Sequence, residues 1–169
     1  MQRLTGHSKR VLLMMMMVFF VWGMVQSGSA QANAASKGYK FTYAKETIMM
    51  GQTAAGFIKA AGAPDKKTAK KSCAYDGKDI TRKYEDFILY TYTNSNSSAA
   101  KEYISGITFL TENVSTAEGI MIGSSKDDVI KAYGKKAPKY GIYTYTKGHT
   151  KLQIEVSGSK VTNIRYVLK

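Results

Sequence analysis

Few side chains in this sequence could carry out catalysis. His149 is the only histidine beyond residue 7, and Cys73 is the only cysteine in the chain. A cysteine nucleophile needs a base such as histidine within hydrogen-bonding reach, and no motif around either residue indicates that the fold brings them together. Structural zinc sites use four ligands, mostly Cys and His. The composition therefore predicts no metal site, no cofactor and no catalytic residues, and we expect a chain that is not an enzyme.

The other residues that could do chemistry have structural explanations. We interpret Asp127 and Asp128 as part of a first helical turn, where the helix dipole favours negative charge. Residues 76–79 have too few oxygen ligands for a calcium loop, and the glycines lack the spacing of a phosphate-binding loop. Cys73 is expected to be a small buried strand residue, with a reactive thiol or an intermolecular bridge as the alternative. His149 is expected in an exposed turn.

The first 34 residues predict a signal peptide. Arg3, Lys9 and Arg10 precede an apolar run over residues 11–25, and small residues with two A-x-A motifs follow at 30–34. An uncleaved membrane anchor is the alternative, but the run is shorter than the roughly 20 residues that a spanning helix needs. We therefore expect a secreted or extracellular chain, in the medium or on the cell wall, with no transmembrane segment once the signal is removed.

The net charge of the chain limits the classes of partner that it is expected to bind. The formal net charge is +13, and it is +10 without residues 1–34, with 22 basic against 12 acidic residues. Such a surface attracts anionic wall polymers, anionic lipid or an acidic protein; for an exported chain we expect no nucleic acid partner. The alternative is that the positive charge only keeps the chain soluble. The best local candidate for an anionic contact is a basic run in a predicted loop, which comprises Lys66, Lys67, Lys70 and Lys71.

Two segments of the sequence match each other, residues 49–62 and residues 121–134. Each predicts a helix of about nine residues that depends on packing for its stability. An N-cap hydroxyl begins each helix, and a glycine ends it before a proline that prevents continuation. The motif positions are Gly51, Thr53, Gly62 and Pro64 in the first copy and Gly123, Ser125 and Gly134 in the second.

Strands follow each predicted helix, over residues 80–84, 87–93, 103–111, 142–146, 151–156 and 161–168. In the fifth of these, Leu152, Ile154 and Val156 alternate with polar residues, as in a strand with one buried face. Short connections predict antiparallel pairing. We therefore predict an α+β fold of two tandem α-β-β-β units, residues 46–113 and 114–169, with short helices packed on an antiparallel sheet. Residues 35–45 are expected to be a linker, and the two units are expected to form one continuous structure.

The motif residues carry a family resemblance. Residues 51–53 and 62–64 reproduce the G-x-[ST] and G-x-P spacing of the SmpA/OmlA (BamE-like) family, and residues 152–164 resemble its closing hairpin. Two such units in tandem resemble the β-lactamase inhibitory protein-like family. The stretch from residues 72–75 through 118–134 resembles a repeat found in secreted and lipid-anchored proteins of Gram-positive bacteria. The resemblance implies a protein-binding module of the cell envelope. The chain lacks the lipid-attachment cysteine of the first family and the disulfide pairs of the second, so neither family's partner carries over.

A sheet face that mixes tyrosine with basic residues is our candidate binding surface, because Tyr and Arg are enriched at binding hot spots. We expect a protein partner of the envelope or extracellular space on this face. The alternative for the tyrosines is a place in the core. Alternative functions are polyanion binding through net charge and inhibition of a secreted hydrolase. The predicted face comprises Arg82, Tyr90, Tyr92, Tyr143, Tyr145, Lys151 and Arg165.

Overall fold

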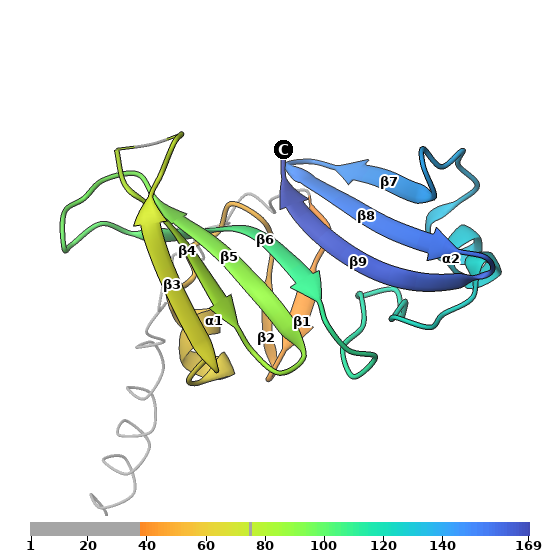
Figure 1. The fold of residues 1–169 in the computed structure, drawn as a ribbon, viewed down its shortest axis with the longest axis horizontal. Helices are drawn as coiled ribbons and strands as arrows, with labels where there is room; N and C mark the ends of the chain where they lie inside the picture. Colours follow the sequence, from red (N-terminus) through yellow and green to blue (C-terminus); the bar gives the residue numbers. More distant parts are fainter. Residues whose placement is uncertain (1–37, 75) are drawn as a thin grey trace, which may run out of the picture. The chain divides into compact units, whose positions relative to one another are not determined.

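The computed structural model describes residues 38–74 and 76–169, and in these ranges it is a β-sheet protein (Figure 1). Nine strands form one seven-stranded and one two-stranded antiparallel sheet, with two helices of 7 and 8 residues. The elements are β1 (Phe41–Tyr43), β2 (Glu46–Ile48), α1 (Ala55–Ala61), β3 (Lys66–Lys71), β4 (Lys78–Lys83), β5 (Phe87–Thr93), β6 (Glu102–Phe109), α2 (Lys126–Tyr133), β7 (Ile142–Lys147), β8 (Thr150–Ser157) and β9 (Lys160–Leu168). The predicted signal peptide, residues 1–34, lies outside the described residues.

The predicted α+β fold is wrong. Each helix buries one side chain, Phe57 in α1 and Val129 in α2, whereas the strands supply most of the core. Capping signals predicted the two helices, but they say nothing about how much of the chain around them is strand. The fold is dominated by its sheets.

The seven-stranded sheet contains all six predicted strands, and its order is β3-β4-β5-β6-β9-β8-β7. The two halves of the chain meet between β6 and β9. At this junction only three residue pairs are in register, Gly106 with Val167, Ile107 with Tyr166 and Thr108 with Arg165. Seven pairs join β5 to β6, and eight join β8 to β9. The central junction is therefore the shortest ladder among these three.

The two matching segments of sequence have the same local geometry. Each is tied to a strand of its own half by backbone hydrogen bonds of 2.8 and 2.9 Å, which join Gly51–Gln52 to Ile104 and Gly123–Ser124 to Val161. Gly51 and Gly123 have φ of 85° and 89°, a conformation that glycine adopts without steric cost. The two segments therefore share one local backbone conformation and one way of pairing to a strand, and the tandem repeat itself stays a prediction.

The two helices begin differently. Ser125 caps α2 as predicted: its hydroxyl accepts from the Asp128 N–H at 3.1 Å, and the Asp128 carboxylate accepts from the Ser125 N–H at 3.2 Å. The Ser125 hydroxyl also donates to the Asp128 carboxylate at 2.6 Å, and this hydrogen bond, together with the one from the Ser125 N–H, lowers the pKa of Asp128. The predicted cap Thr53 does not cap α1, because the N-cap position is one residue later, at Ala54, whose side chain makes no capping hydrogen bond. Thr53 instead forms an isolated bridge with Tyr103.

Removing the two hydroxyls should therefore have unequal effects. Ser125→Ala is expected to lower the free energy of unfolding by about 1 kcal/mol, the usual cost of losing an N-cap. Thr53→Ala serves as the matched control and should change it by less than about 0.5 kcal/mol. Urea unfolding of both variants checks this. Equal losses would show that Thr53 also stabilises its helix.

The expected linker, residues 35–45, contains β1 and enters the core. Phe41 is 0% exposed, and its ring lies 5.3 to 6.1 Å from those of Phe57, Phe87, Phe109 and Tyr166. These partners come from α1, β5, β6 and β9. A residue from the first described strand thus joins side chains from both halves of the chain.

The structure contradicts the predicted position of one of the two residues considered for chemistry and agrees with that of the other. Cys73 is exposed and lies between β3 and β4, so the prediction of a buried strand residue is wrong. His149 is exposed in the turn between β7 and β8, as predicted.

Candidate protein-binding face

Strand register divides the predicted face residues between two sides of the sheet. Directly paired residues share a side. One row runs from Arg82 through Leu89, Ile107, Tyr166 and Leu152 to Tyr145, and all of these side chains are buried. This is the core side.

Three predicted face residues are therefore misplaced in the sequence-based prediction. Arg82, Tyr143 and Tyr145 are 5%, 3% and 5% exposed on the core side. Tyr143 and Tyr145 pair with Ile154 and Leu152, which supply the buried face of β8. Burial is the main cause that raises the pKa of Tyr145, and its hydroxyl donates to the Gly134 carbonyl at 3.0 Å.

The other four predicted residues share the opposite side. The row next to the core row runs through Thr81, Tyr90, Gly106, Val167 and Lys151. Further rows add Tyr92 opposite Tyr103, and Ile88, Thr108 and Arg165 in line. We call this surface the outer face and define it by Ile88, Tyr90, Tyr92, Tyr103, Lys151 and Arg165.

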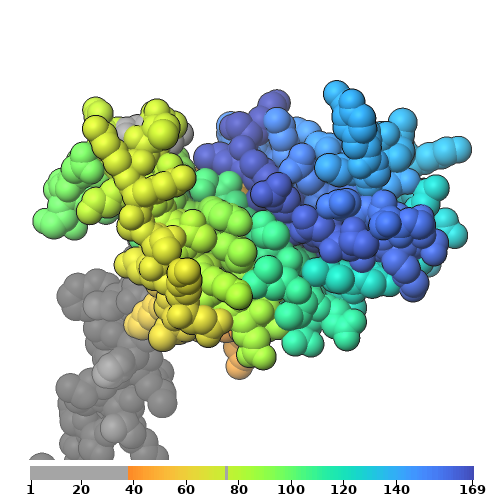
Figure 2. Space-filling view, viewed as in Figure 1, coloured from red at the N-terminus to blue at the C-terminus, as the bar shows by residue number. Residues whose placement is uncertain are grey.

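The outer face is open among the described residues. In Figure 1 the β1–β2 hairpin lies behind β5 and β6, and in Figure 2 the sheet hides nearly all of its atoms. The side chains of the outer face are half-buried by their neighbours in the sheet, except Arg165, which is exposed. Beside Arg165, a shallow hollow of about 50 Å³ is lined by Ile142, Gln153, Glu155 and Asn163.

Aromatic rings form the centre of the β5–β6 part of this face. The rings of Tyr92 and Tyr103 lie 5.6 Å apart at 31°. Tyr90 is opposite Gly106, where an added Cβ would lie 3.4 Å from the tyrosine ring and 3.0 Å from the Tyr166 carbonyl oxygen. A side chain at Gly106 would therefore press on both the ring and the central junction of the sheet.

Tyr103 was missed because a register shift decides its position. The pairing of β5 with β6 shifts between Tyr90 and Thr91, and Ser105 has no partner in it. This irregularity places Tyr103, and not Ile104, opposite Tyr92. Alternation along one strand does not reveal such a bulge in its partner. Its signal in the sequence is weak, a glycine at 106 inside a strand.

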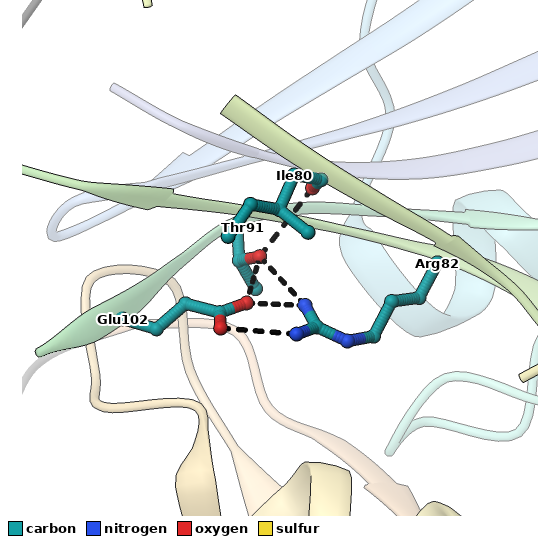
Figure 3. A network of polar contacts seen from close by, with 4 residues as sticks. All are labelled: Ile80, Arg82, Thr91 and Glu102. Carbon is teal, nitrogen blue, oxygen red and sulfur yellow. Dashed lines mark hydrogen bonds and ion pairs between the residues drawn. The ribbon is translucent and has the colours of Figure 1, made fainter. Parts of the chain in front are cut away.

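Arg82 is buried because it belongs to a polar network inside the sheet (Figure 3). Its guanidinium binds the Glu102 carboxylate through both terminal nitrogens, with Nη2 at 3.0 Å from Oε2. The Thr91 hydroxyl accepts from Arg82 at 3.1 Å and contacts Glu102. The Arg82 and Glu102 side chains are 6% and 20% exposed. The arginine is thus a structural residue, satisfied by its partners.

The basic run predicted as a loop is strand β3. It forms one edge of the seven-stranded sheet, and all six of its residues are exposed. Register puts Lys66 and Lys70 on the same side as the outer face and Lys67 and Lys71 on the other. Lys66 is directly opposite Lys83, and Lys71 is opposite Lys78. Like charges in such pairs destabilise a sheet, so this hairpin carries an uncompensated positive charge.

Within residues 38–74 and 76–169, no group of three or more His, Cys, Asp or Glu side chains could hold a metal ion. The same residues include no helix with the length and hydropathy to cross a membrane. The chain matches no protein-family model, no curated protein and no solved structure. The sheet faces therefore have to be interpreted from their own chemistry.

Proposed function

We propose that this chain is a non-catalytic binding module, exported to the envelope or the extracellular space, that engages a protein partner through the outer face. The observation that carries the proposal is the cluster of Tyr90, Tyr92 and Tyr103 on an open sheet face. Tyrosine offers a large apolar contact area and a polar end at little cost in side-chain entropy. Arg165 and Lys151 lie on the same face across the β6–β9 junction.

This surface suits a folded protein better than a small molecule. The tyrosines are spread over neighbouring strands, and the one described hollow on the face measures about 50 Å³, below the range of roughly 300–1,000 Å³ for ligand pockets. Flat aromatic surfaces with basic residues nearby are typical of the centres of protein interfaces.

Site-specific photo-crosslinking tests the proposal. A photoreactive amino acid at position 90 should capture one protein from isolated envelope or culture medium, while the same group at Thr42 on the β1–β2 hairpin should not. Capture should persist from about 50 to about 500 mM salt, because added salt screens exposed charge contacts but leaves the contacts of the tyrosine rings in place. Capture that is equal from both positions, or lost at high salt, would contradict the proposal.

The identified partner then permits an affinity test. Tyr103→Ala should weaken binding by about 30-fold, the loss expected for a hot spot of about 2 kcal/mol. Thr47→Ala, an exposed change on β2, is the control and should leave affinity unchanged. Circular dichroism of both variants establishes that the fold is retained.

A further inference from the structure

We infer that β3 is a docking site for an extended acidic peptide, which adds to the seven-stranded sheet as an eighth strand. This site is distinct from the outer face. Among the described residues no strand pairs with the free side of β3. An edge strand presents unpaired N–H and C=O groups, and strand addition uses them for main-chain hydrogen bonds.

Charge selects the occupant. Strands β3 and β4 carry six lysines and one acid, Asp79, which is opposite Lys70, and the turn between them adds Asp76. Arg82 is neutralised by Glu102. A second copy of β3 would place lysines against lysines. The chain's own residues 1–37 contain no Asp or Glu, so they do not supply the complementary charge either. An acidic segment of another protein does.

The distribution of the lysines favours a peptide over an anionic polymer. Lys66 and Lys70 lie on one side of the sheet, and Lys67 and Lys71 lie on the other. A polymer on either side reaches only half of them, and a phosphate chain along the edge has no donors for the carbonyl groups of β3. A strand in register with β3 has side chains on both sides and pairs with every lysine.

The spacing of the lysines defines the sequence that fits. β3 reads Lys-Lys-Thr-Ala-Lys-Lys, so the complementary strand has acids at positions 1, 2, 5 and 6. This pattern is the same in both directions, and it therefore serves parallel or antiparallel addition. Cross-strand neighbours are about 5 Å apart at Cβ, within reach of Glu and Lys.

Peptide binding to residues 35–169 tests the inference by fluorescence anisotropy. The matched peptide is Thr-Glu-Glu-Val-Thr-Glu-Glu-Thr with blocked ends, and a permuted peptide of the same composition carries Glu-Val-Glu-Glu-Thr-Glu at its centre. The permuted peptide should bind at least tenfold more weakly. Two further versions are N-methylated at alternate residues, and the version blocked on the protein-facing side should lose binding while the other keeps it.

Two double variants locate the site. Lys67→Gln with Lys71→Gln should weaken the matched peptide at least tenfold, and Lys101→Gln with Lys126→Gln, two exposed lysines outside β3, should not. Equal binding of matched and permuted peptides, with displacement by polyphosphate, would overturn strand addition in favour of a simple polyanion site. Absence of binding at about 50 mM salt, where charge attraction is strong, would overturn the inference altogether.

Discussion

Phe41→Ala is expected to lower the free energy of unfolding by about 3–5 kcal/mol, the range for removing a buried aromatic ring. Phe41 is 0% exposed, and the four rings around it belong to α1, β5, β6 and β9. Its removal leaves a cavity at the point where both halves of the chain meet. Small domains are stable by about 5–15 kcal/mol, so a chain at the lower end of that range would be brought close to unfolding at room temperature.

Denaturant unfolding of the chain from residue 35 measures this effect. The control is Thr42→Ala, next in sequence and exposed, with one hydroxyl contact to Thr47. It should change stability by no more than about 0.5 kcal/mol. A loss below about 1 kcal/mol for Phe41→Ala would mean that β1 contributes little to the core, contrary to its burial.

Arg82→Ala is expected to cost about 3 kcal/mol, at the lower end of the range for breaking a buried ion pair, because Glu102 is partly exposed. The variant leaves the Glu102 carboxylate with Thr91 but without its cation. The double variant Arg82→Met with Glu102→Leu removes both charges and keeps the volume. It should recover most of the loss, since apolar replacements of buried pairs are often neutral.

Thermal unfolding of the wild type, Arg82→Met, Glu102→Leu and the double variant gives the coupling between the two side chains. If the double variant is as unstable as Arg82→Ala, the ion pair itself stabilises the sheet beyond satisfying two buried charges. The same series also separates folding from binding, because Arg82 lies on the core side and its variants should affect a partner only through stability.

The strands that were predictable are those with one apolar face. In β8, Leu152, Ile154 and Val156 alternate with polar residues. β5 is a run of apolar and aromatic residues bounded by turn residues, which predicts a strand without saying which face is buried. β3 has no buried residue at all, so it gives no alternation and is indistinguishable from a solvated loop. β1 and β2 have three residues each, too few for a periodic pattern.

The choice of face was harder to predict than the strands. In β7, Tyr-Thr-Tyr-Thr shows alternation but not which set is buried. The two-residue turn at Gly148 and His149 pairs Lys147 with Thr150, and this register alone puts Tyr145 beside Leu152. That inference was available from the sequence. The burial of Arg82 was not, because it depends on Glu102, twenty positions away on a strand that is not adjacent in sequence. The resemblance to the SmpA/OmlA family stays a prediction.

The short central junction has a consequence for any molecule held on the outer face. Its tyrosines belong to β5 and β6, whereas Lys151 and Arg165 belong to β8 and β9, and only three residue pairs join these halves within the sheet. A partner that contacts both groups would link the two halves across the β6–β9 junction. Its binding free energy then resists separation of the halves, by about 2.7 kcal/mol when the partner is present at a hundred times its Kd. A partner that binds the outer face as proposed would therefore raise the free energy of unfolding of the chain, which would be least stable when unbound.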